Sequence, residues 1–267
     1  MSEIINLLHY SFVQRALIAG SLISVCASVL GVILVLKHYS LIGHGLSEIG
    51  FASLSIAAAL EISAIYITAP SVIIAAFVIM FVSEKFKTAG DIAIAVASSA
   101  ALAMGVIISS LSGSASNMSS YLFGSVLALS ESDLIFAVIL AVIVIFSFII
   151  FYNRLFLITY NEDYARSLGI NITFYQALIS ILTALIVVTG MRIMGTLLIS
   201  GVIILPAVSA KSLASGFKSL VIISAIISFT AFIAGLILSF VMNLPAGAGV
   251  ILTNTIILIL VKACVKK

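Results

Sequence analysis

Long apolar stretches, separated by short polar connections, run along almost the whole chain. Most are long enough to cross about 30 Å of hydrocarbon as helices that rise about 1.5 Å per residue. Two of them, 174–189 and 246–261, are shorter, so tilted or broken helices are expected there. The pattern predicts an all-α fold, a polytopic transmembrane helical bundle of about nine spans, with eight spans as the alternative. The nine stretches are 12–36, 41–60, 62–82, 92–111, 134–152, 174–189, 193–210, 220–242 and 246–261.

Composition agrees with this pattern and excludes several classes of protein. Hydrophobic residues make up 63% of the chain and charged residues 8%, whereas soluble domains are about 45–50% apolar and about 25% charged. A water-soluble enzyme, a disordered chain and a nucleic-acid binder are therefore excluded. The sequence contains no Walker-type phosphate-binding run, so we expect no enzyme activity and no ATP hydrolysis by that route. We expect a single transmembrane domain over residues 1–267.

The basic residues predict an orientation for this bundle. With nine spans and the N-terminus outside, Arg15 and Arg192 are the two of the 12 lysines and arginines that fall outside the membrane. Cytoplasmic connections carry an excess of lysine and arginine in multi-pass proteins. The sequence therefore predicts an outer N-terminus, a cytoplasmic C-terminus and a place in the cell membrane.

Two connections are long enough to carry features of their own. The outer loop 112–132 is rich in Ser, Gly and Asn, and its apolar piece 121–129 is too short to span, which indicates a re-entrant or interfacial segment. The cytoplasmic loop 153–173 holds the densest charge cluster of the chain. Its segment 160–169 begins with capping residues and ends on Gly169, which predicts a short helix with a glycine stop. Its charges suit either a docking surface for another protein or a solvated loop.

Two polar residues lie where the pattern predicts membrane. His44 and Glu48 are four residues apart and therefore share one helical face. A carboxylate at this depth is costly unless it is paired, hydrated or metal-bound, so the position is a functional candidate. Imidazole and carboxylate ligands suit Zn, Mn or Fe(II). Three readings stay open: a neutral, hydrogen-bonded glutamate that holds the bundle together, a transported-ion site, and a proton relay.

Smaller features concern packing within the spans. Pro206 is expected to kink the seventh span, either as simple packing or as part of a gate. Small residues recur every four positions in two rows, which predicts close approach of helix backbones in lipid. The rows are Gly20, Ser24 and Ser28, and Ala231, Gly235 and Ser239.

Six short runs, in order along the chain, resemble the membrane permease subunits of ATP-binding-cassette importers for zinc, manganese and iron. At position 44 the family usually has Asp and at position 48 His, so His44 and Glu48 present the two ligand types in exchanged order. The runs are Arg15-Ala16-Leu17-Ile18-Ala19-Gly20 with 31–36, Ser40-Leu41-Ile42-Gly43 with 45–47, Tyr121-Leu122-Phe123-Gly124-Ser125, 163–170, 198–210 around Leu205-Pro206-Ala207, and Leu244-Pro245-Ala246-Gly247.

The resemblance implies a function and a set of partners. It implies a permease that acts in two copies, as a homodimer, and moves a divalent transition-metal ion (Zn, Mn or Fe) into the cytoplasm without a tightly bound cofactor. It also implies cytoplasmic ABC ATPase subunits, which would hydrolyse the ATP, and an extracytoplasmic metal-binding protein. The ATPase-coupling loop would contain Glu162, Asp163, Ala165, Arg166 and Gly169. The alternative function is an ion-coupled secondary transporter in which Glu48 carries a proton or cation.

Overall fold

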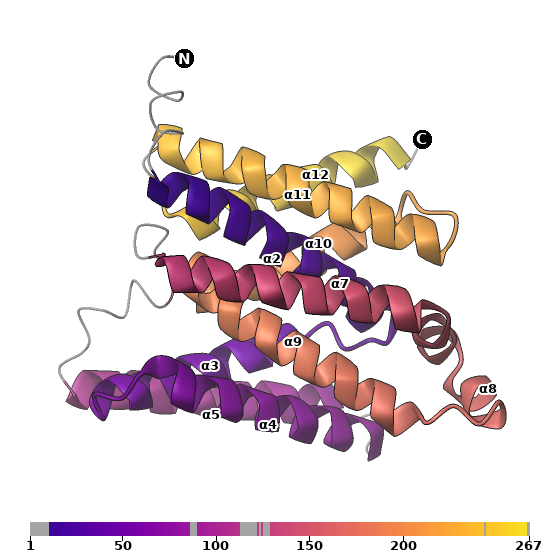
Figure 1. Cartoon of the computed structure of the whole chain (residues 1–267), viewed down its shortest axis with the longest axis horizontal. Helices are drawn as coiled ribbons and strands as arrows, with labels where there is room; N and C mark the ends of the chain where they lie inside the picture. Colours follow the sequence, from indigo (N-terminus) through magenta and orange to yellow (C-terminus); the bar gives the residue numbers. More distant parts are fainter. Residues whose placement is uncertain are drawn as a thin grey trace.

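The computed structural model describes residues 11–85, 90–112, 122, 124, 129–242 and 244–265. Within these ranges every regular element is a helix, and the helices form one bundle (Figure 1). The predicted all-α fold is therefore confirmed. The helices are α2 (Ser11–Leu36), α3 (Ile42–Ala59), α4 (Ala64–Lys85), α5 (Gly90–Leu111), α7 (Glu131–Tyr160), α8 (Glu162–Ser167), α9 (Ile172–Met194), α10 (Thr196–Lys211), α11 (Phe217–Met242) and α12 (Ala246–Val265).

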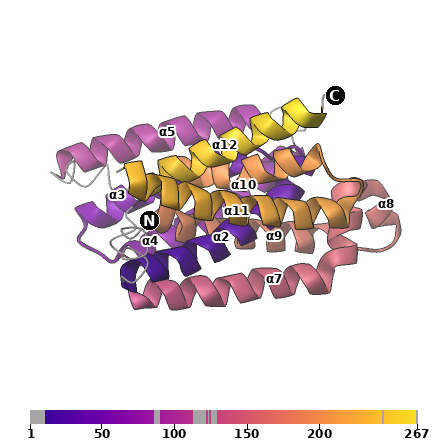
Figure 2. The ribbon, with the colours of Figure 1, turned by 90° about the horizontal axis from the view of Figure 1, so that it is seen from above.

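Helices α2 and α3 are each packed against four other helices. Helix α2 packs against α7, α9, α10 and α11, and α3 packs against α4, α5, α9 and α10. Figure 2 shows α5 and α12 along one side of the molecule and α7 along the opposite side. The helix that carries His44 and Glu48 is therefore surrounded by four others.

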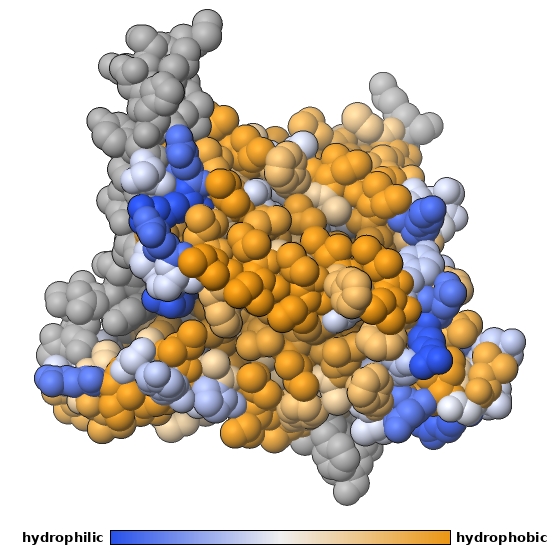
Figure 3. All heavy atoms as spheres, viewed as in Figure 1, coloured by the Kyte–Doolittle hydropathy of each residue, from blue (hydrophilic) through white to orange (hydrophobic). Residues whose placement is uncertain are grey.

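The surface is apolar in the middle and polar at two opposite ends. Figure 3 shows hydrophilic side chains at the left and right ends and hydrophobic ones between them, over α7. Of the described helices, six are long and apolar enough to cross a membrane by length and composition: α2, α5, α7, α9, α11 and α12. An apolar middle between two polar ends is the surface expected of a polytopic helical membrane protein, in which lipid rather than water covers the apolar side chains.

Small residues bring the helices close together, as the two rows predicted. The hydroxyl oxygens of Ser24 on α2 and Ser228 on α11 lie 2.6 Å apart, and Ser228 also donates to the Ser24 carbonyl at 2.8 Å. A Cβ added to Gly235 on α11 would collide with the backbone of Val250 on α12. Hydrogen bonds from hydroxyl groups and close approach of backbones are the usual contacts that hold helices together in lipid.

Several helices extend beyond the predicted apolar stretches. Helix α7 continues past residue 152 to Tyr160, because apolar residues resume after Arg154, and two of them, Leu155 and Ile158, are buried in the bundle. The expected cytoplasmic loop 153–173 therefore begins with helix. Helices α9 and α12, expected to be tilted or broken, are single helices of 23 and 20 residues. Most of the predicted outer segment 121–129 lies outside the described residues.

Candidate functional site

His44 and Glu48 face each other across one turn of α3. His44 Nε2 lies 3.2 Å from Glu48 Oε1, so the structure brings the predicted pair together. The two side chains differ in their surroundings, because 46% of the His44 side chain is exposed but only 9% of the Glu48 side chain. The pair therefore joins a buried carboxylate to an imidazole that is open at the surface of the single chain.

The carboxylate of Glu48 retains an acceptor with no partner. Its Oε2 atom is buried and makes no hydrogen bond within the described part of the chain. A buried acceptor without a partner is unfavourable, and more so for a charged group. This oxygen is therefore free to accept either a cation or a proton, which are the two functional readings of the sequence.

Glycines keep α3 close to its neighbours around this pair. A Cβ on Gly43 would lie 3.2 Å from the Ile203 side chain of α10, and one on Gly45 would lie 2.8 Å from the Ile94 side chain of α5. Helix α3 is consequently packed closely against α10 and α5 on either side of His44 in the sequence.

A single chain supplies an incomplete set of metal ligands. Among the described residues, no group of three or more His, Cys, Asp or Glu side chains lies together. His44 and Glu48 provide one nitrogen and one oxygen ligand, and Zn sites have four ligands as a rule. A metal ion held here would need ligands from water or from another chain.

The short helix α8 follows α7 as the sequence predicted. Asn161 caps its N-terminus and accepts a hydrogen bond from the backbone N–H of Tyr164 at 3.0 Å. Gly169, with φ +76°, ends it in a left-handed conformation. The N–H of Ile170 donates to the Ala165 carbonyl at 3.2 Å, and that of Gly169 to the Arg166 carbonyl at 3.0 Å. These two bonds form the Schellman motif that glycine favours at helix ends.

The side chains of α8 divide between the bundle and the solvent. Ala165 is fully buried, whereas Asp163, Arg166, Tyr164 and Leu168 are exposed. An open hollow of about 540 Å³ lies beside them, lined by Phe151, Arg154, Leu168, Gly169, Ile170, Asn171, Phe174 and Tyr175. Exposed aromatic and aliphatic side chains next to charges and a hollow form a surface suited to another protein.

Glu162 does not share this exposed surface. Its Oε1 lies 2.5 Å from Nζ of Lys37, at the end of α2, and only 5% of the Lys37 side chain is exposed. The sequence analysis did not identify Lys37 as a functional residue. The only signal for it in the sequence was a lysine directly after the long apolar stretch 12–36.

Pro206 lies within α10 rather than at a break in it. The helix continues from Thr196 to Lys211, and Pro206 is buried. A proline cannot donate the usual backbone hydrogen bond, so its presence here leaves one carbonyl of the preceding turn without that partner. Its part in a gate stays a prediction.

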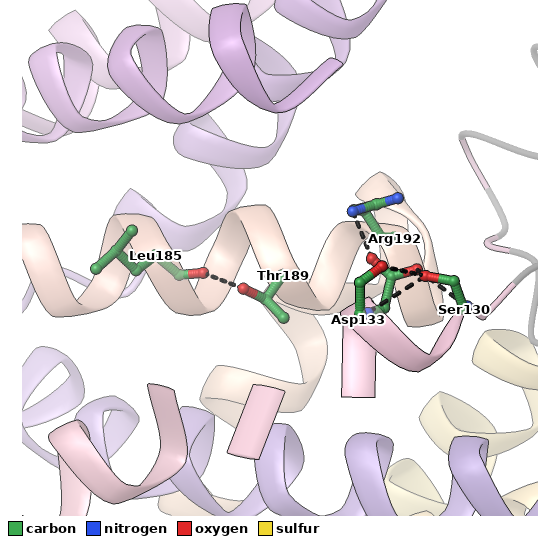
Figure 4. Close-up of polar contacts among 6 residues, drawn as sticks. Ser130, Asp133, Leu185, Thr189 and Arg192 are labelled. Carbon is green, nitrogen blue, oxygen red and sulfur yellow. Dashed lines mark hydrogen bonds and ion pairs between the residues drawn. The ribbon is translucent and has the colours of Figure 1, made fainter. Parts of the chain in front are cut away.

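The opposite end of α7 is held by ion pairs that the sequence analysis did not foresee. Asp133 accepts hydrogen bonds from the backbone N–H and the hydroxyl of Ser130 at 3.1 and 2.8 Å (Figure 4). Its other oxygen lies 2.5 Å from Nη1 of Arg192, at the end of α9. Beside it, Arg15 of α2 pairs with Glu131 at 3.0 Å. The Ser-x-x-Asp spacing of a capping box was the available signal in the sequence.

Known proteins match this fold and sequence over nearly the whole chain. Residues 9–265 match the ABC 3 transport family. The chain is 30% identical to the manganese transport system membrane protein MntC of Listeria monocytogenes, over 94% of this chain and 90% of that protein. It is 29% identical to the manganese import system permease protein ScaB of Streptococcus gordonii, over 96% and 93% of the two chains.

A solved structure extends this likeness to three dimensions. The fold superposes on PsaBC from Streptococcus pneumoniae, solved in complex with Fab, with a TM-score of 0.87 and 27% identity over 97% of this chain and 94% of that chain. The family match covers all ten described helices, including the intramembrane pair of α3 and the exposed helix α8. The chain is thus a multi-pass protein of the cell membrane and belongs to the ABC 3 transport family.

Proposed function

We propose that this chain is the membrane permease of an ATP-binding-cassette importer that moves a divalent transition-metal ion, Zn, Mn or Fe, into the cytoplasm. The observation that carries the proposal is the His44–Glu48 pair, a nitrogen and an oxygen ligand 3.2 Å apart inside a family permease. Similar proteins are named as manganese transporters, which favours manganese. The metal is the transported substrate, and the permease carries out no covalent chemistry.

The proposed topology has nine crossings, an outer N-terminus and a cytoplasmic C-terminus. The described part of the chain holds nine helices of 16 to 30 residues in addition to α8, and six of the nine are long and apolar enough to cross a membrane. Figure 1 shows α2 beginning at the end opposite to the one where α12 finishes. An odd number of crossings produces this arrangement, which supports nine over the alternative of eight. The distribution of lysine and arginine then assigns the α8 end to the cytoplasm.

Two copies of the permease are proposed to form one pathway. The half-exposed His44 leaves the metal pair open at the surface of one chain, and the described residues of that chain offer no third acidic, histidine or cysteine ligand beside it. A second copy that faces the first would bring its own His44 and Glu48 to the same ion. The ion would then be held between subunits and released when they separate, as conduction requires.

Helix α8 is proposed to dock the cytoplasmic ABC ATPase subunits. Its exposed Tyr164 and Leu168 and the charges of Asp163 and Arg166 offer a contact surface, while the buried Ala165 anchors it to the bundle. Closure of the ATPases around ATP would move α8, and the motion would open the His44–Glu48 site alternately to each side of the membrane. An extracytoplasmic metal-binding protein would deliver the ion to the outer face.

Replacement of Glu48 tests the proposed function. Glu48→Ala should abolish ATP-dependent Mn²⁺ uptake in cells that lack other importers, while the variant still inserts into the membrane. Glu61→Ala is the matched control, because Glu61 follows the same helix but is exposed, and its uptake should equal that of the wild type. Full uptake by Glu48→Ala would refute the site.

The same assay separates the proposed importer from a secondary transporter. The unpartnered Oε2 of Glu48 could also carry a proton. Uptake that persists without the ATPase subunit and stops when an uncoupler collapses the proton gradient would favour the secondary transporter. Uptake that requires the ATPase subunit favours the importer.

A further inference from the structure

An ion pair between a buried lysine and a partly exposed glutamate joins α8, the proposed ATPase contact, to the end of α2. Lys37 Nζ lies 2.5 Å from Oε1 of Glu162, the first residue of α8. The Lys37 side chain is 5% exposed and the Glu162 side chain 37%. Lys37 Nζ also lies 6.0 Å from the centre of the Tyr39 ring. Within the described residues, Nζ of Lys37 is buried and makes no hydrogen bond, so the ion pair with Glu162 is the contact that compensates for the burial of its charge.

The residues after Lys37 form a tight, hydrogen-bonded turn into α3. His38 has φ +61°, and the N–H of Tyr39 donates to the Leu34 carbonyl at 2.8 Å. The N–H of Ile42, the first residue of α3, donates back to the Tyr39 carbonyl at 3.1 Å. His44 follows two residues later. A displacement of Lys37 is therefore passed through a short, bonded turn to the end of α3 that carries the metal pair.

Helix α8 does not depend on Lys37 for its attachment to the bundle. It is capped by Asn161, closed by the Gly169 turn, packed on α7 and α9, and anchored by the fully buried Ala165. The ion pair adds a different connection, from α8 to the turn between α2 and α3. Its place suits the transfer of movement better than the folding of α8.

We propose that Lys37 is a positioning residue that couples movement of α8 to the His44–Glu48 site through its ion pair with Glu162. This inference rests on the proposed function. When the ATPases close and shift α8, Glu162 displaces Lys37, and the turn 37–41 moves the beginning of α3. Loss of the pair leaves ATP hydrolysis in place but separates it from metal movement.

The test measures Mn²⁺ ions imported per ATP hydrolysed by the full transporter, permease with ATPase subunits and binding protein, in proteoliposomes. Lys37→Met should lower this ratio by roughly tenfold, within the 5–150-fold range of coupling effects between sites, while the ATPase still co-purifies. The double variant K37M/E162M removes both charges and so leaves no unpaired buried charge to disturb folding. It should show the same loss, and the exchanged pair K37E/E162K should restore part of the ratio. Lys218→Met, at an exposed lysine of α11, is the control and should keep the wild-type ratio.

The outcomes separate this inference from the proposed function. If the wild-type transporter imports none of Mn²⁺, Zn²⁺ and Fe²⁺ with ATP, the proposed function fails whatever Lys37 does. If the wild type imports Mn²⁺ and the well-folded K37M/E162M variant keeps the wild-type ratio, the coupling role of Lys37 is wrong and the proposed function stands. An equal fall in ATP hydrolysis and in uptake, with the ratio unchanged, would also overturn it, because that result indicates a structural role.

Discussion

The turn that ends α8 offers a substitution whose cost follows from the backbone alone. Gly169 has φ +76°, and a Cβ added to it would meet no atom within 4 Å. Gly169→Ala therefore introduces no clash, and its cost is the left-handed strain of an L-residue, about 1–2 kcal/mol. A free-energy change of this size lowers the ratio of native to opened turn by a factor of roughly 5–30.

The strain should appear as weaker binding of the ATPase. An opened turn releases the end of α8 and with it the exposed Leu168, so only a fraction of the permease presents the docking surface. The apparent Kd rises in proportion as the competent fraction falls. Titration of the purified ATPase subunit against detergent-purified permease should therefore show a Kd for Gly169→Ala that is higher by up to roughly 5–30-fold.

Two further variants isolate the backbone as the cause. Gly216 is also exposed, a Cβ on it also meets nothing within 4 Å, and its φ lies outside the left-handed region. Gly216→Ala should leave the Kd unchanged. Gly169→Asn should bind better than Gly169→Ala, because asparagine tolerates the left-handed conformation. Wild-type affinity in Gly169→Ala, or an equal loss in Gly216→Ala, would refute the reasoning.

Two other predictions concern the opposite end of the bundle and the topology. Asp133→Ala removes a capping acceptor and the ion pair that the largely buried Asp133 side chain makes with Arg192. It should lower the free energy of unfolding by about 1–2 kcal/mol more than Glu131→Ala does, because the Glu131 side chain is 78% exposed. Equal melting temperatures of the two variants would contradict this. In a Cys264→Ser background, needed because Cys264 is exposed, cysteine at Ser112 should react with an impermeant reagent from outside and cysteine at Ser215 only from inside. The reverse pattern would invert the topology.

The helices were predictable from the sequence because apolar length alone specifies them in a membrane protein. Nine apolar stretches correspond to nine described long helices, and the glycine stop of α8 was predicted at the right residue. The end of α7 was missed, although the apolar residues that resume after Arg154 were a signal for it in the sequence. Asn153 and Arg154 resemble the end of a span, but the Arg154 side chain donates to the Tyr175 hydroxyl of α9 at 2.6 Å, and the helix continues. A tertiary contact of this kind has no signature in the local pattern.

The candidate site was predictable only where it is local. His44 and Glu48 meet because a spacing of four places them on one face of a helix. The partner of Lys37 could not be found this way, because Glu162 reaches it only through the packing of α8 beside the end of α2. The same holds for Asp133 and Arg192, which meet through the packing of α7 on α9.

These long-range pairs determine which helices move when α8 is displaced. Helices α7 and α9 are joined at one end by α8 and its turn and at the other by the Asp133–Arg192 pair. Because they are joined at both ends, we expect them to resist separation. Helix α2 is bound to this group of helices at both of its ends, through Arg15 and through the Lys37–Glu162 pair. We therefore expect movement of α8 to displace α2, and the turn after α2 leads into the helix that carries the His44–Glu48 pair.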